Sequence, residues 1–160
     1  MSLRSVSPKV LALFVALGLG LPTVQAATPP AKVSVGDVVV LLDGAAPGGR
    51  EAELGRTLRA ALNEELASLA ESGATGRRPL VVSATLTKLL TERRAERARA
   101  TASISLVLRR ADDQVLFAEL RGRASVEETS DSVAVVQQAA LRGAVRGAVA
   151  RLPEAVQRAR

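Results

Sequence analysis

The side chains that could do chemistry in this sequence are carboxylates and arginines, because the usual catalytic and metal-binding residues are missing. The chain of 160 residues contains no His, Cys, Trp or Tyr. Nucleophile pairs of the Ser–His or Cys–His kind are therefore excluded. Zinc, copper and iron sites lose their usual ligands for the same reason. Three pairs of adjacent carboxylates remain as candidates for acid–base chemistry: Glu64-Glu65, Asp112-Asp113 and Glu127-Glu128.

These pairs are better interpreted as surface charge and turn residues. Neighbouring residues on a helix or strand point in different directions, so two adjacent carboxylates do not converge on one substrate. A hydrolase that works with carboxylates alone is the one enzymatic alternative that can be defended. We therefore expect a protein that is not an enzyme and that has no cofactor and no metal site.

The arginines suggest a binding surface instead. The net charge is +6, almost all of the positive charge is Arg, and the arginine fork suits carboxylate and phosphate. An arginine-rich composition also follows from codon bias in a genome, and we give that reading equal weight. A nucleic acid is not expected as the partner, because stacking needs aromatic side chains and only Phe117 is aromatic beyond residue 26.

A basic cluster is expected at one end of the sheet, in the connection between the second and third strands. Arginines gathered there, with two more on a neighbouring strand, can bind an anionic partner. The predicted partner-binding residues are Arg93, Arg94, Arg97, Arg99, Arg121 and Arg123, together with Val107 and Phe117 on the open sheet face. The alternative is a solvated hairpin tip whose charge is neutralised by the nearby Glu92, Glu96, Glu127 and Glu128.

Residues 1–26 have the pattern of a cleavable signal peptide. Arg4 and Lys9 precede an apolar run of 12 residues, Val10–Leu21, and Val24-Gln25-Ala26 fits a cleavage site after Ala26. A transmembrane anchor, the alternative, needs about 20 apolar residues. Without a cysteine, a lipid anchor at a lipobox is excluded. We expect export to the periplasm and, after cleavage, a protein without a transmembrane span.

In the remaining chain, residues 27–32 are expected to be a linker. Residues 33–160 are expected to fold as one α+β domain with the element order β-α-β-β-β-α. Two amphipathic helices would lie on one face of a mainly antiparallel four-stranded sheet. The expected strands are 33–42, 79–92, 99–110 and 115–126, and the expected helices are 51–72 and 132–151. The apolar stripe of the first helix consists of Leu54, Leu58, Leu62, Leu66 and Leu69, and that of the second of Leu141, Ala144, Val145, Ala148 and Leu152.

Two details of the sheet are also predicted. The run Val38–Leu42 is apolar on both faces, which indicates an interior strand. A five-residue loop, Arg110–Gln114, keeps the apolar residues of both flanking strands on one face. That loop pairs Arg109 with Val115, and it places Val107 opposite Phe117, Ser103 opposite Arg121 and Thr101 opposite Arg123 on the outer face.

The long hairpin Thr101–Val126 with its acidic turn, followed by an alanine-rich helix with Val133 and Leu141 through Leu152, resembles small modules of Gram-negative envelope proteins. The N-terminal module of the periplasmic TolB protein and the curli-secretion lipoprotein domain are of this kind. Many such proteins carry a lipobox cysteine, from which this chain departs. The resemblance implies an exported accessory protein that binds another envelope component.

No functional residue is carried over from these modules, because no diagnostic motif is shared. The expected partner is an envelope protein or another anionic envelope component, and the sequence leaves self-association open. An anion-binding module for acidic glycans or lipid headgroups is the alternative from a different class.

Overall fold

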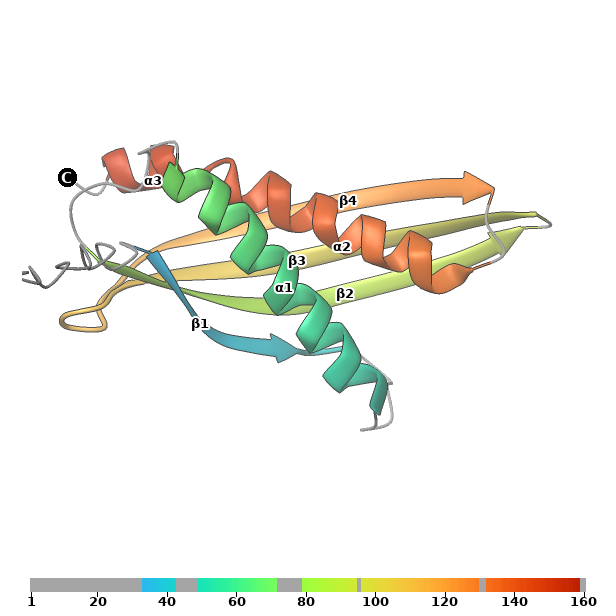
Figure 1. Cartoon of the computed structure of the whole chain (residues 1–160), viewed down its shortest axis with the longest axis horizontal. Helices are drawn as coiled ribbons and strands as arrows, with labels where there is room; N and C mark the ends of the chain where they lie inside the picture. Colours follow the sequence, from blue (N-terminus) through green and yellow to red (C-terminus); the bar gives the residue numbers. More distant parts are fainter. Residues whose placement is uncertain (1–32, 43–48, 72–78, 95, 130–131, 159–160) are drawn as a thin grey trace, which may run out of the picture.

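The computed structural model describes residues 33–42, 49–71, 79–94, 96–129 and 132–158. The expected signal peptide and linker lie outside these ranges. Figure 1 shows the elements in chain order. They are β1 (Val33–Val40), α1 (Gly49–Glu71), β2 (Leu80–Arg94), β3 (Arg97–Arg110), β4 (Leu116–Thr129), α2 (Val133–Val149) and α3 (Leu152–Arg158). The order β-α-β-β-β-α is confirmed, and the short α3 follows α2 where Pro153 interrupts the helical sequence.

The four strands form one mixed sheet in the order β1-β2-β3-β4. β1 and β2 are parallel, because helix α1 carries the chain back across the sheet between them. The other two pairs are antiparallel. The prediction of an interior position for the first strand is wrong, since β1 lies at the edge. Its inner side packs against the core, while Val39 and Leu41 on its outer side are 42% and 62% exposed.

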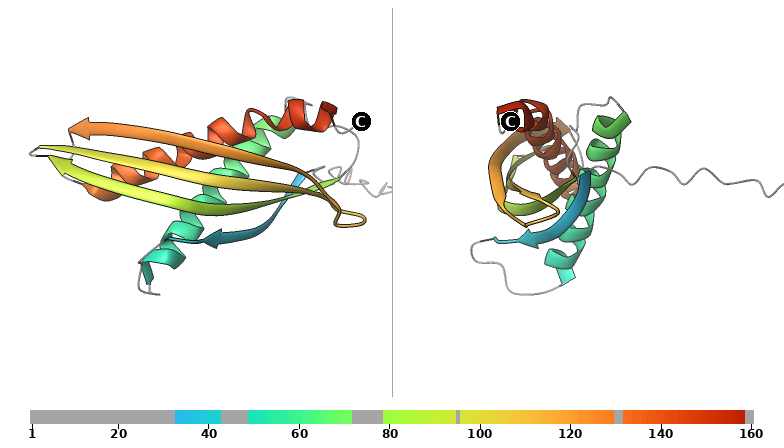
Figure 2. Two further views of the ribbon diagram at one scale, coloured as in Figure 1. Left: turned by 180° about the vertical axis from the view of Figure 1, so that it is seen from behind. Right: turned by 90° about the vertical axis from the view of Figure 1, so that its left-hand side faces the viewer.

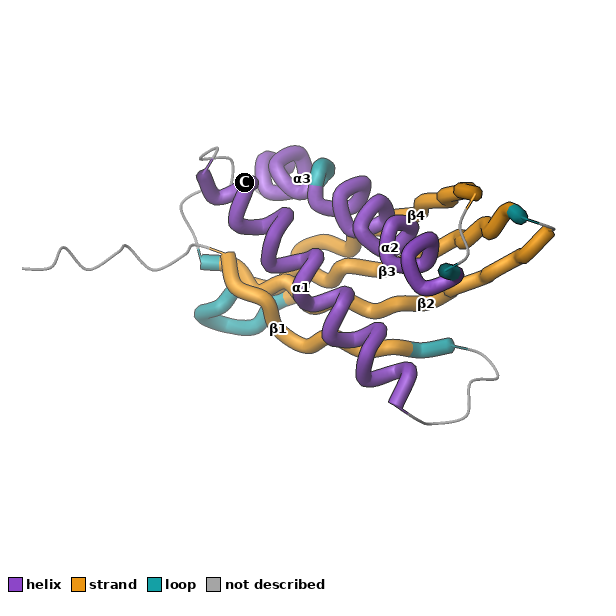
Figure 3. The backbone as a smooth tube through the Cα atoms, turned by 45° about the vertical axis from the view of Figure 1, so that its right-hand side comes forward, coloured by secondary structure: helices purple, strands orange, loops and turns teal. Residues whose placement is uncertain are grey.

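The helices form a single layer on one face of the sheet (Figures 2 and 3). The predicted leucine stripe of α1 is confirmed: Leu58 and Leu62 are fully buried, Leu54 and Leu66 nearly so. The predicted stripe of α2 is buried as well. Burying leucines of this kind contributes about 1.5–3 kcal/mol each, so these two stripes and the inner side chains of the strands hold the layers together.

Helix α2 lies very close to β4 because the facing residues are small. A Cβ atom on Gly122 would collide with the carbonyl oxygen of Ala144 and lie 2.9 Å from the Cβ of Ala148. On β3 the same inner face presents small buried side chains near the hairpin tip, Ala98, Ala100 and Ala102. The alanine-rich composition of α2 and β3 is therefore a packing requirement.

The hairpin between β3 and β4 has a different register from the predicted one. The backbone N–H of Arg110 donates to Val115 (3.1 Å), and Gln114 closes the turn with a left-handed φ of 58°. This four-residue turn shifts the pairing by one residue. A bulge at Phe117 shifts it by one more, so that Arg109 faces Leu116 and Leu108 faces Ala118.

The bulge also exchanges the sides of two residues. Phe117, expected on the outer face, packs against the core, while Leu116, expected inside, is 55% exposed. The predicted pairing of Val107 with Phe117 is therefore wrong, and Val107 lies opposite Glu119. Beyond the bulge the total shift is two residues, which preserves the inward and outward sides of β4.

Candidate functional site

The outer face of β2, β3 and β4 has no helix over it, as the view from behind in Figure 2 shows. Its side chains alternate with the buried ones and are almost all polar. Six pairs of residues from β3 and β4 follow one another along this face: Val107–Glu119, Ser105–Arg121, Ser103–Arg123, Thr101–Ser125, Arg99–Glu127 and Arg97–Thr129.

The predicted basic cluster lies in the strands and not in a loop, because β2 and β3 extend to the hairpin tip. Arg94 and Arg97 are paired residues at the ends of the two strands. Arg93 pairs with Ala98, whose side chain is buried on the helix-covered side of the sheet. Arg93 therefore belongs to the inner side of the sheet. It does not share a face with Arg94, Arg97 and Arg99.

The outward arginines at the tip are already engaged. Arg94 lies 4.0 Å from Glu92 and Arg97 lies 3.6 Å from Glu127. Arg99 donates from Nε to the Oγ of Ser125 at 3.1 Å. The tip encloses only a small hollow of about 70 Å³. These contacts favour the alternative of a self-paired hairpin tip over that of a binding site.

The register shift separates Arg121 and Arg123 from the tip. Arg123 lies opposite Ser103 and Arg121 opposite Ser105, each two residues further along β3 than predicted. Ser103, which Arg123 faces, is four residues after Arg99 on β3. At a rise of about 3.3 Å per residue, Arg123 therefore lies about 13 Å further along the sheet than Arg99. The single basic surface predicted from the sequence is therefore divided into two parts.

Arg121 and Arg123 line a larger hollow further along β3 and the edge strand β4, with a volume of about 610 Å³. Its other side chains come from β2, β3, β4 and the turn between α2 and α3. They are Thr87, Ser103, Ser105, Glu119 and Arg151, with Ile104 and Gly122 completing the wall. We call the space that these residues line the outer-face hollow. Sequence analysis missed Arg151, because only the packing of α2 against β4 brings the end of that helix to this place.

One side of the outer-face hollow is organised by hydrogen bonds. The hydroxyl of Ser105 donates to Oε1 of Glu119 at 3.0 Å, and Nε of Arg121 donates to the same oxygen at 3.1 Å. The hydrogen bond from Ser105 and the contact with Arg121 lower the pKa of Glu119 below its usual value. Glu119 is therefore ionised near neutral pH and offsets much of the charge of Arg121.

The other side of the hollow keeps its positive charge. Within the part of the chain that the structure describes, neither Arg123 nor Arg151 has an ion pair. Lys88 on β2 lies opposite Ser103 and adds a third exposed cation to this side. The hydroxyl of Thr87 is used in a hydrogen bond to the carbonyl oxygen of Ser103 (3.0 Å). The arrangement suits an anionic group held by Arg123 and Arg151.

The carboxylate pairs considered for catalysis lie in separate places. Glu65 accepts a hydrogen bond from Nε of Arg146 at 2.9 Å, which ties α1 to α2. Asp113 accepts from the backbone N–H of Val115 at 3.0 Å and from Nε of Arg110 at 3.1 Å. The bond from Val115, with the charge of Arg110, lowers the pKa of Asp113. These carboxylates hold the helices and the turn in place.

Two further observations apply to the described residues. They contain no group of three or more Asp or Glu residues placed to hold a metal ion. None of the helices in these ranges is long and apolar enough to cross a membrane.

The fold and the hollow define an α+β domain with one helix-covered sheet face and one open, basic face. No known family model matches the sequence, and no curated protein sequence matches it significantly. A Xanthomonas campestris protein of the family DUF330 has the same fold, with a TM-score of 0.51 at 13% identity over 82% of this chain and 91% of the other.

Two further solved structures are similar at lower scores. A candidate lipoprotein from Caulobacter crescentus CB15 has a TM-score of 0.48 at 17% identity, over 81% of this chain and 91% of its own. PelC from Paraburkholderia phytofirmans, a dodecamer, has a TM-score of 0.42 at 9% identity, over 69% and 86%. The fold is therefore one that this chain shares with another bacterial protein. The specific likeness to the TolB module and the curli-secretion domain is not supported by these matches.

Proposed function

We propose that this protein is an exported, non-enzymatic accessory component of the bacterial cell envelope that binds an anionic partner through the outer-face hollow. Export is inferred from the chain's own first 26 residues, which have the charge, apolar run and cleavage pattern of a signal peptide. The names of the matched structures describe those proteins and not this chain.

The observation that carries this proposal is the unbalanced charge of the outer-face hollow. Arg123 and Arg151 have no ion pair among the described residues, whereas Arg94 and Arg97 at the tip each have one. A hollow of about 610 Å³ beside them offers room for a partner's side chains. Several uncompensated cations on one surface attract an anionic partner and steer its approach.

An acidic surface of another envelope protein is the partner that we propose. Exposed charges of this kind act mainly on association and specificity. Binding should therefore weaken with added salt, since the screening length is about 8 Å at physiological ionic strength.

The test is capture of partners from envelope extract by three forms of the purified protein. Arg123→Ser with Arg151→Ser removes the two uncompensated charges from the hollow and should reduce capture of the main partner by about tenfold, equivalent to ~1.4 kcal/mol. Arg50→Ser with Arg142→Ser is the control, because it removes the same charge from exposed helix positions. Capture that falls equally in both variants would mean that net charge alone matters, and the proposal would be wrong.

An acidic glycan is a second candidate, favoured by the hydroxyl of Ser103 beside Arg123. Titration with two soluble polyanions separates the candidates. Poly-glutamate represents an acidic protein surface, and polygalacturonate represents an acidic glycan. Tighter binding of polygalacturonate, lost in Ser103→Ala, would replace the protein partner by a glycan.

A further inference from the structure

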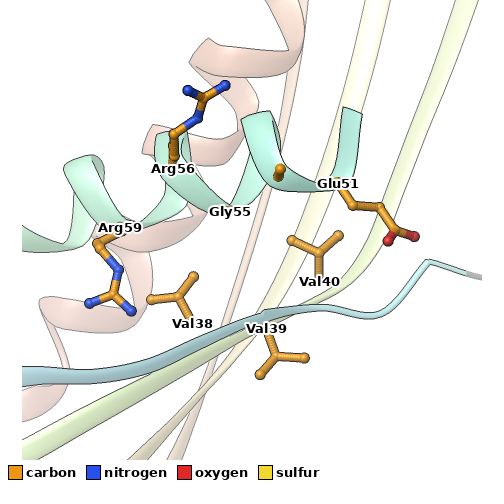
Figure 4. A pocket seen from close by; sticks show the side chains of 8 residues that line it. Val38, Val39, Val40, Glu51, Gly55, Arg56 and Arg59 are labelled. Carbon is orange, nitrogen blue, oxygen red and sulfur yellow. The ribbon is translucent and has the colours of Figure 1, made fainter. Parts of the chain in front are cut away.

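A third hollow lies at the opposite edge of the sheet, between edge strand β1 and the first half of α1, and it has a volume of about 420 Å³. Figure 4 shows Val38 and Val40 pointing toward the helix and Val39 pointing away from it. The helix contributes Gly55, which faces Val40 and leaves the groove open. We call this hollow the β1–α1 groove. It shares no residue with the outer-face hollow.

The strand beside the groove is an edge of the sheet. Among the described residues β1 pairs only with β2. Its first half is interrupted by an irregularity between Val35 and Val38, where Asp37 is exposed. Its second half, Val38–Leu42, is entirely aliphatic. Proteins usually protect such edges with charges, prolines or bulges, and this stretch has none of them.

The backbone of this stretch is ready to pair with another strand. The N–H of Leu41 donates to the carbonyl oxygen of Leu86 in β2 at 2.9 Å. Backbone groups of successive strand residues point to opposite sides, so the N–H and C=O groups of Val40 point away from β2. An added strand would find its hydrogen-bond partners there.

The groove also has a charge at each end. Figure 4 shows the guanidinium of Arg59 extending toward β1 near Val38, while Glu51 lies near the other end, beyond Val40. Neither has an ion pair within the described ranges. Arg59 follows Glu51 by eight positions, which corresponds to about 12 Å along the helix axis. Three residues at alternate positions of a strand point to the same side and span about 13 Å. Three inward-facing residues of an added strand would therefore match the length of the groove.

We propose that β1 accepts an extended segment of a partner protein as a fifth strand, with its inward side chains in the β1–α1 groove. An acidic residue of that segment lies opposite Val38 and against Arg59, and an aliphatic residue lies opposite Val40 and beside Gly55. A basic residue two positions away lies opposite Leu42 and against Glu51. Antiparallel pairing then requires the order basic, aliphatic, acidic at alternate positions. Strand addition of this kind takes its affinity from backbone hydrogen bonds and its specificity from alternate side chains.

The probe is a heptapeptide with Lys at the second, Val at the fourth and Glu at the sixth position, and Thr elsewhere. It is titrated into the isotope-labelled full chain and followed by NMR. The amide of Val40 should shift and exchange more slowly, while the amide of Leu41, already bonded to β2, should change little. N-methylation of the peptide at its pairing amides should weaken binding by at least about tenfold.

Variants of the groove make the test specific. Gly55→Leu fills the groove and should abolish binding, whereas Gly55→Ala should retain it, since a Cβ there lies 3.8 Å from Val40. Both replacements favour the helix, so melting curves should show folded protein. Exchanging the charges with Glu51→Lys and Arg59→Glu should transfer the preference to the peptide with Lys and Glu exchanged.

Three outcomes would overturn the proposal. Binding that survives Gly55→Leu would place the peptide elsewhere. Shifts confined to the outer-face hollow would assign the peptide to that surface. Slow exchange of Val40 without peptide, together with sedimentation as a dimer or larger, would show that a second copy of the chain covers this edge.

Discussion

The two faces of the β3–β4 hairpin are built from alternate residues of the same strands and yet differ in almost every physical property. The inner face is apolar and buried, and Gly122 lets α2 approach to backbone contact. The outer face is polar, and its charges lie in solvent. The difference teaches that the inner face determines the fold, whereas the outer face is free to carry chemistry.

The largest expected effect concerns the inner layer. Leu62 is fully buried in the stripe of α1, so Leu62→Ala should lower the free energy of unfolding by about 2–5 kcal/mol, as for other buried leucines. Leu90→Ala makes the same truncation on an outer position that is 48% exposed, and it should change stability by less than about 0.5 kcal/mol. Denaturant melts measure both, and equal losses would show that the outer face is structural too.

The second prediction concerns the close approach of α2 to β4. Gly122→Ala places a methyl group against the carbonyl oxygen of Ala144, and overpacking of this kind should cost about 2–3 kcal/mol. The matched control is Gly147→Ala, where nothing lies within 4 Å of the new atom. That replacement should stabilise α2 by about 0.5–1 kcal/mol. A neutral Gly122→Ala would mean that the helix and strand are less tightly packed than described.

Much of the fold follows from the sequence because periodicity determines it. The leucines of α1 and the alternation in β2 and β3 each bury one face, and the structure buries those faces. The position of β1 could not be predicted from its pattern. A run that is apolar on both faces occurs in interior strands, and it also occurs here in an edge strand that α1 covers on one side. The pattern alone therefore does not distinguish the two positions.

The register of the β3–β4 hairpin could not be predicted from the sequence, because it depends on the local conformation of two residues. It depends on Gln114 adopting a left-handed conformation and on a bulge at Phe117. Glutamine gives no sequence signal for that conformation, unlike glycine or asparagine. The placement of Arg121 and Arg123 on the outer face could be predicted, because a shift of two residues preserves sides. Their distance from the tip, and the contribution of Arg151, could not.

The smallest expected effect tests whether the outer face is organised in the absence of a partner. The hydrogen bond from Ser105, followed by the contact with Arg121, lowers the pKa of Glu119. A lowered carboxylate pKa in the folded state stabilises the fold at pH values above the unfolded pKa of about 4.3, and this contribution is lost as the pH falls through the folded pKa.

Ser105→Ala should therefore raise the pKa of Glu119 toward its usual value, and Arg121→Ser should raise it by a comparable or smaller amount. Ser103→Ala is the control, since Ser103 makes no hydrogen bond to Glu119 among the described contacts. The side-chain carboxyl carbon of Glu119, followed by NMR between pH 7 and pH 2, measures all four proteins. If Ser105→Ala leaves the titration unchanged, Glu119 is not held by this network. The outer face would then be an unorganised polar surface, and its contrast with the inner face would be one of exposure alone.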